Sequence, residues 1–93
     1  MAGKLKPKKQ VVYIPMHAVG RLDHPDCEEG FITSINRDED GRIVTVFCRF
    51  WSKYHGGLRT KLNSEGCNPE SLVLKDTRSQ ELVDRIYEEL GYG

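Results

Sequence analysis

The segment His24-Pro25-Asp26-Cys27 brings together side chains that could act in catalysis or bind a metal ion. A cysteine nucleophile needs a base within hydrogen-bond reach and a third group that orients the base. His24 lies close to Cys27 in the sequence, and His17 and His55 are available elsewhere. Pro25 stiffens the segment, however, and no glycine motif for an oxyanion hole accompanies it. We therefore expect a loop histidine and a structural thiol, and not an enzyme.

The same segment could supply zinc ligands, because structural zinc sites use ligand pairs at short spacing. His24 and Cys27 make one such pair, whereas Cys48 and Cys67 stand alone. Cys48 shares one face of its predicted strand with apolar residues, namely Val44, Val46 and Phe50. We therefore expect no metal and no cofactor. The three cysteines have no regular spacing and no signal peptide precedes them, so reduced thiols and a cytoplasmic location are expected.

Acidic residues gather in two polar segments, residues 17–29 and residues 37–42. They are Asp23, Asp26, Glu28 and Glu29 in the first segment, and Asp38, Glu39 and Asp40 in the second. If both loops flank the same edge of a small barrel, these side chains form a negative rim that attracts basic protein partners. The alternative is a solvated surface that Arg21, Arg37 and Arg42 partly neutralise.

Aromatic residues continue beyond the second acidic segment. Phe50 belongs with the core face of its strand, whereas Ile43 and Phe47 lie on the opposite face, which we expect the C-terminal helix to cover. Trp51 and Tyr54 lie near the following turn. Because interfaces favour tryptophan and tyrosine, we interpret these two as exposed anchors for a protein partner.

The N-terminus is basic, although the formal net charge of the chain is zero. Residues 1–10 contain four lysines and no acid, and the rest of the chain has more acidic than basic residues. The four are Lys4, Lys6, Lys8 and Lys9. A flexible arm of this kind can touch phosphates only weakly and without sequence preference, so nucleic-acid or ribonucleoprotein binding is the alternative function.

The elements that must position these residues are short and β-rich. Residues 31–36 and 43–51 predict a hairpin, because β-branched and aromatic residues flank a polar turn that contains Asp40-Gly41. Two further strands are predicted, at residues 11–16 and 58–62. A turn at residues 63–66 and a 3₁₀ turn at residues 68–71 are expected to precede a last strand at residues 72–74.

A C-terminal helix follows. Its apolar residues recur with the helical period, at Leu82, Val83, Ile86, Tyr87 and Leu90. Thr77 and Gln80 have the spacing of a capping box, and Gly91 is placed to end the helix. The chain of 93 residues, 38% apolar and 30% charged, is long enough for one small folded domain and contains no apolar run of membrane-spanning length.

This order of elements resembles the SH3-like barrel over about residues 11–75. The resemblance rests on Glu29-Gly30-Phe31-Ile32 and on Asn68-Pro69-Glu70-Ser71-Leu72-Val73. The sequences of residues 13–17 and 24–30 are also similar to those of short, uncharacterised SH3-like proteins of bacteriophages and prophages. We therefore expect an SH3-like barrel of about five antiparallel strands over residues 11–75, with residues 1–10 as a flexible basic arm and the helix of residues 76–93 packed on the barrel. The resemblance implies a fold and a viral origin, but no mechanism. From the acidic loops and the aromatic residues we expect a non-enzymatic module that binds a host or viral protein, such as a host defence factor.

Overall fold

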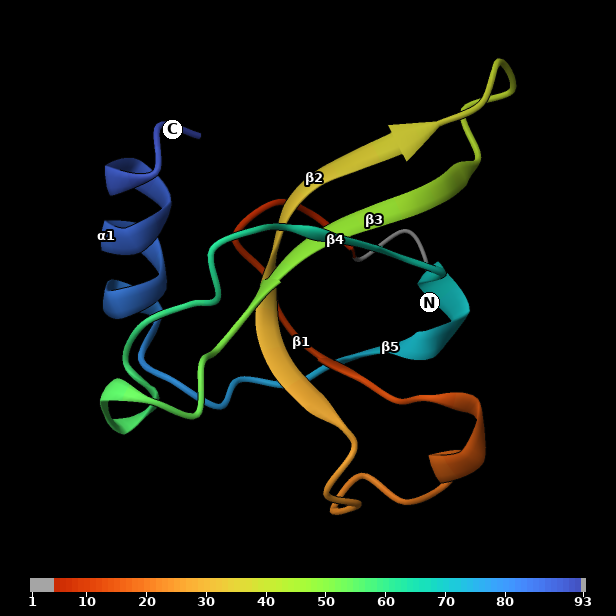
Figure 1. The fold of residues 1–93 in the computed structure, drawn as a ribbon. Coiled ribbons are helices and arrows are strands. Elements are labelled where there is room, and N and C mark those ends of the chain that lie inside the picture. The colour runs from red at the N-terminus through yellow and green to blue at the C-terminus, as the bar shows by residue number, and fades with distance from the viewer. Residues whose placement is uncertain (1–4, 93) are drawn as a thin grey trace.

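Two long strands form the centre of the fold in a computed structural model, which describes residues 5–92 except for the side chain of His55. β2 (Glu28–Arg37) and β3 (Ile43–Phe50) pair antiparallel across the polar turn (Figure 1). The predicted hairpin is confirmed. Its first strand begins three residues earlier than the pattern indicated.

The remaining strands extend the sheet on both sides of this hairpin. β1 (Gln10–Tyr13), β4 (Glu65–Cys67) and β5 (Leu72–Leu74) complete one antiparallel sheet in the order β4-β3-β2-β1-β5. The 3₁₀ turn Pro69–Ser71 joins the two edge strands, and Asn68 caps it by accepting a hydrogen bond from the Glu70 amide. The mainly-β prediction of five antiparallel strands and one helix is therefore confirmed. Within residues 5–92 the sheet is open, since no ladder joins β4 to β5.

The middle of β2, residues 30–33, is buried on both faces, which explains its apolar run. Ile32 faces the core inside the curved sheet, and Phe31 faces the helix. The pairing with β3 shifts by one residue at Thr33, whose hydroxyl donates to the Phe47 carbonyl oxygen at 3.1 Å. A bulge of this kind bends a strand, and Figure 1 shows β2 strongly curved.

The apolar side chains form two clusters on opposite sides of β2. The first cluster lies inside the curved sheet and contains Leu5, Val11, Ile32, Val46, Cys48, Phe50, Cys67 and Leu72. The second lies under the helix and contains Phe31, Trp51, Val83 and Tyr87. The helix is thus held to the sheet by aromatic packing.

α1 (Gln80–Glu89) confirms the predicted helix but not its N-terminal cap. The cap is Ser79, whose hydroxyl accepts from the Leu82 amide at 3.2 Å, so the capping box at Thr77 was wrong by two residues. Gly91 ends the helix with φ +83°, and the amides of Gly91 and Tyr92 donate to the carbonyls of Glu88 and Tyr87. This is a Schellman motif, and the Tyr87 and Tyr92 rings pack 5.2 Å apart.

The flexible arm predicted for residues 1–10 is wrong for the part that the structure describes, because residues 5–10 are docked on the sheet. Leu5 is buried in the first cluster, and the Lys8 amide donates to the Ile32 carbonyl at 2.8 Å. The Lys9 amide closes a turn onto the Lys6 carbonyl, with Lys8 at φ +74°. Lys4 lies outside the described residues.

Two further elements differ from the sequence analysis. Residues 58–62 form only an isolated bridge, Thr60 with Trp51, whereas the predicted turn at residues 63–66 contains the start of β4. Ile43 packs against the first cluster and not under the helix, since a second register shift follows Asn36. Val44, placed on the core face by alternation, is exposed for the same reason.

Gly30 provides a test of the close contact between β2 and β3. A Cβ atom at this position would lie 2.2 Å from the Arg49 carbonyl oxygen and 2.8 Å from the Phe50 Cα. Because both are backbone atoms, Gly30→Ala is expected to lower the free energy of unfolding by at least about 2 kcal/mol. Denaturant titration measures the change. Ser34→Ala, at an exposed position of the same strand, should change stability by less than about 0.5 kcal/mol; equal effects would contradict this packing.

Candidate functional site

A broad, open hollow of about 950 Å³ lies between two loops at one end of the sheet. Residues 22–29 form one side, and residues 51–54, Gly57 and Lys61 form another. Six of the nine predicted partner-binding residues line it: Asp23, Asp26, Glu28, Glu29, Trp51 and Tyr54. The structure therefore brings the first acidic segment and both proposed anchors to a single surface.

This hollow is not a negative rim, because basic residues balance the acids. Lys53, Lys61, Lys75 and Arg78 also line it. Lys61 pairs with Glu28, and this hydrogen bond raises the pKa of Lys61. Arg78 Nη1 lies 3.2 Å from Glu29 Oε1. The prediction of a negative rim is therefore wrong for this hollow.

The second acidic segment lies elsewhere. Asp38, Glu39 and Asp40 follow the end of β2, whereas the hollow lies at its start. A strand of ten residues spans about 30 Å, and Figure 1 shows the two loops at opposite ends of the hairpin. Asp38 Oδ1 accepts from the amides of Asp40 and Arg42, which organises the turn. The expectation that both loops flank one edge is wrong.

Trp51 and Tyr54 have different environments. Trp51 is only 6% exposed and packs on Phe31, with ring centroids 5.6 Å apart. The prediction of an exposed tryptophan anchor is wrong, because α1 covers the strand end that carries Trp51. Tyr54 is 78% exposed, so a partner in the hollow can reach its ring.

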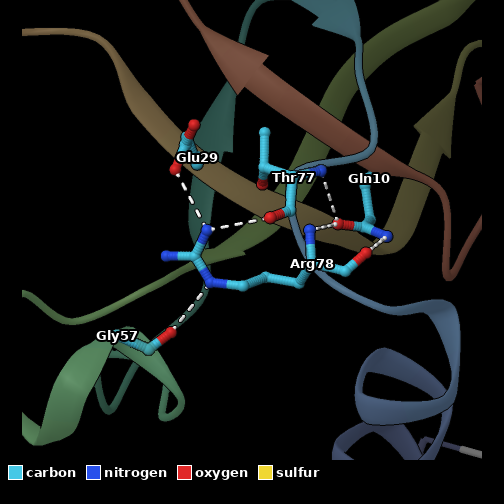
Figure 2. Close-up of polar contacts among 5 residues, drawn as sticks. All are labelled: Gln10, Glu29, Gly57, Thr77 and Arg78. Atoms are coloured by element: carbon cyan, nitrogen blue, oxygen red, sulfur yellow. Dashed lines mark hydrogen bonds and ion pairs between the residues drawn. The ribbon is translucent and has the colours of Figure 1, made fainter.

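Arg78, which the sequence analysis did not single out, supports one wall of the hollow (Figure 2). Its Nε donates to the Gly57 carbonyl at 3.0 Å, and its Nη1 contacts Glu29 and the Thr77 carbonyl. The guanidinium carbon lies 5.3 Å from the centroid of the Trp51 ring, within cation–π range. Arg78 thus joins the segment before α1 to both loops.

Gln10 holds this segment from the other side. Its side chain is buried, its Oε1 accepts from the amides of Thr77 and Arg78, and its Nε2 donates to the Arg78 carbonyl at 2.8 Å. Figure 2 shows the amide facing these backbone groups. The sequence analysis placed Gln10 in the arm. The one feature of the sequence that indicates a role for Gln10 in the sheet is its position directly before two valines.

The side chains of His24 and Cys27, considered above as a catalytic or zinc-binding pair, do not hydrogen-bond to each other among the described residues. The Cys27 thiol donates to the Arg21 carbonyl at 3.4 Å, and His24 Nδ1 accepts from the Asp26 amide at 3.0 Å. His17 Nε2 instead lies 2.7 Å from Asp26 Oδ2. This hydrogen bond holds the pKa of Asp26 below its usual value, against a smaller opposing effect of desolvation.

The other two cysteines lie in the first cluster. Cys48 is buried as predicted, and Cys67 is buried as well. Hydrogen bonding with Cys67, followed by burial, raises the pKa of the Cys48 thiol far above its ordinary value. Neither thiol is positioned to act as an exposed nucleophile.

Lys6, Lys8 and Lys9 do not line the hollow. Lys6 and Lys9 are exposed, whereas the Lys8 ammonium lies 5.2 Å from the centroid of the Tyr87 ring. Lys8 therefore contributes to the packing around α1.

Comparison of the chain with family models, with curated proteins and with solved structures finds no match. None of the helices within residues 5–92 is long and apolar enough to cross a membrane.

The Gln10 amide can be tested by substitution. Gln10→Met keeps a similar volume but leaves the amides of Thr77 and Arg78 and the Arg78 carbonyl without their partner, so the free energy of unfolding should fall by at least about 3 kcal/mol. The control is Asn36→Leu, which likewise replaces an amide by an apolar side chain, but at an exposed residue of β2, and should cost less than about 1 kcal/mol. Similar losses for both variants in urea unfolding would show that the buried amide has no special role.

Thiol reactivity tests the placement of the cysteines. In the native protein, the half-buried Cys27 should be alkylated first, and Cys48 and Cys67 only when the protein unfolds, because burial denies the reagent access to both thiols. For Cys48 the raised pKa also suppresses the thiolate. Mass spectrometry of time-resolved labelling gives the order. Labelling of Cys48 or Cys67 as fast as that of Cys27 would contradict the packing of β3 against β4.

Proposed function

We propose that this protein is a non-enzymatic protein-interaction module whose partner binds in the hollow between residues 22–29 and residues 51–61. The observation that carries the proposal is the convergence of four acidic candidates with the exposed ring of Tyr54, from a separate loop, on one hollow. The four are Asp23, Asp26, Glu28 and Glu29. A concave surface with a reachable aromatic residue and charges of both signs suits recognition of a protein segment.

The chemistry of the hollow indicates what kind of partner fits. Glu28 and Glu29 already have ion-pair partners, whereas Asp23, Lys53 and Lys75 have none within 4.0 Å among the described residues. A complementary partner therefore presents both a basic and an acidic group around an apolar or aromatic side chain that packs on Tyr54. This replaces the purely basic partner expected from the sequence.

The walls of the hollow are organised before any partner arrives. Arg78 bonds to Glu29 and to Gly57, and Gln10 fixes the backbone of Arg78. Ordering a surface in advance reduces the entropy lost on association. This favours a dedicated binding surface over a solvated loop region.

We also propose that the open sheet is a variant of the SH3-like barrel. The strand order, the long connection between β1 and β2 and the 3₁₀ turn before β5 support this assignment. With the resemblance of residues 13–17 and 24–30 to phage proteins, it supports an accessory protein of viral origin that acts in the host cytoplasm on a host or viral protein, for example a defence factor.

The competing functions have weaker support in the geometry. A cysteine enzyme would need Cys27 beside a base, but its thiol donates to a backbone carbonyl. Nucleic-acid binding would use Lys4, Lys6, Lys8 and Lys9, but Lys8 packs over Tyr87 and Leu5 anchors this segment in the core. Deleting residues 1–10 would therefore remove core residues as well as charge.

Variants at the two ends of β2 test the proposal directly. A pull-down from bacterial lysate, with quantitative mass spectrometry of captured proteins, compares the wild type with Tyr54→Ala and with the hairpin variant Glu39→Lys/Asp40→Lys. Tyr54→Ala should weaken capture of the specific partner by about tenfold, because an exposed aromatic anchor contributes more than 1 kcal/mol. The hairpin variant should bind normally.

A lysine variant separates the nucleic-acid alternative. Lys6→Gln/Lys9→Gln removes two exposed charges and keeps Leu5 and Gln10 in place. Normal capture by this variant is expected. Loss of binding in the lysine or hairpin variant, together with normal binding by Tyr54→Ala, would place the binding surface outside the hollow and contradict the proposal.

A further inference from the structure

The connection between β1 and β2 is a chain of consecutive tight turns. Amides of Ala18, Arg21, His24 and Cys27 each donate to the carbonyl three residues earlier, at 2.9 to 3.0 Å. Ala18 is fully buried and anchors the loop to the body of the protein. These turns bring His17 next to residues 24–26, although six residues lie between His17 and His24 in the sequence.

Three potential metal ligands meet at this point. His17 Nε2 lies 2.7 Å from Asp26 Oδ2, and His24 Nδ1 lies 4.0 Å from the same oxygen. The two imidazole rings pack edge to face at 5.4 Å between centroids. One ligand atom from each residue falls within a group whose members all lie within 4.8 Å of one another. The sequence analysis missed this group because it paired His24 with Cys27.

We propose that His17, His24 and Asp26 form a binding site for a divalent transition-metal ion of the zinc type. Two imidazoles and one carboxylate are ligands that zinc, nickel and copper prefer, whereas magnesium and calcium prefer sites made of oxygen. Three protein ligands also leave a coordination position open, as in many zinc sites that bind water or another group.

The geometry requires small adjustments. Ligand atoms around tetrahedral zinc lie about 3.3 Å apart. On metal binding, the distance of 2.7 Å between His17 and Asp26 would lengthen and that of 4.0 Å between His24 and Asp26 would shorten. Each distance would change by less than about 1 Å. The side chains of His17 and Asp26 are 62% and 58% exposed and have room to rotate. The metal replaces the hydrogen bond between His17 and Asp26 and the one that His24 accepts from the Asp26 amide.

The site lies at the edge of the hollow, since both His24 and Asp26 line it. The inference does not rest on the proposed protein partner, because all three ligands belong to this chain. Metal binding is therefore measured on the isolated protein.

Calorimetric titration of the untagged, reduced protein with zinc chloride tests the site. We expect saturable binding of one ion per chain, and no comparable binding of magnesium chloride. His17→Ala and Asp26→Asn should each lower zinc affinity by at least about tenfold. NMR spectra of the imidazole nitrogens should show zinc-dependent shifts for His17 and His24 in the wild type, which provides a readout without any substitution.

Two controls distinguish this ligand set from others in the same loop. Asp23→Asn makes the same change of charge as Asp26→Asn, also within the hollow, and should bind zinc like the wild type. Cys27→Ser should also retain affinity, because its thiol bonds to Arg21 and not to the cluster. The proposal is overturned if the wild type shows no saturable zinc binding, if His17→Ala and Asp26→Asn bind normally, or if Cys27→Ser alone abolishes binding.

Discussion

The buried side-chain amide of Gln10 is the constraint on which the arrangement depends. It satisfies three backbone groups in the segment between β5 and α1, so that segment can lie against β1 without burying unpaired polar atoms. The position of this segment determines where α1 begins and where the Arg78 side chain reaches the hollow. Arg78 then ties the loop at Gly57 to Glu29 at the start of β2. One buried amide thereby links the strand, the helix and the hollow.

The length of β2 separates the molecule into two different ends. The hairpin turn has acids that mainly organise its own backbone. The opposite end combines a hollow of balanced charge, an exposed tyrosine and a histidine–aspartate cluster. Since these features share Asp26 and His24, a metal ion in the loop and a partner in the hollow would influence each other through the same side chains. Both the proposed partner surface and the proposed metal site belong to this end.

The sequence predicted those parts of the fold that local patterns determine. The hairpin, the strand at residues 72–74 and the helix follow from side-chain periodicity and from turn residues. Other features depend on contacts between segments that are distant in the sequence, and the periodicity of side chains does not reveal such contacts. These features are the burial of Trp51, the docking of Leu5 and the pairing of β4 with β3. Within the site, Asp23 to Glu29 were identified by charge, but their basic neighbours Lys61 and Arg78 come from elsewhere in the chain. Bulges at Thr33 and after Asn36 shifted the faces of β2 and β3 relative to a regular alternation.

The central claim is that the end of the sheet with the hollow is the binding surface. NMR chemical-shift mapping of the labelled protein with its captured partner tests this most directly, because it reports every amide in one experiment. The account predicts that the largest changes fall on residues 22–29 and 51–61, while Asp38, Glu39 and Asp40 remain unchanged. Changes confined to the hairpin turn or to Lys6 and Lys9 would contradict it.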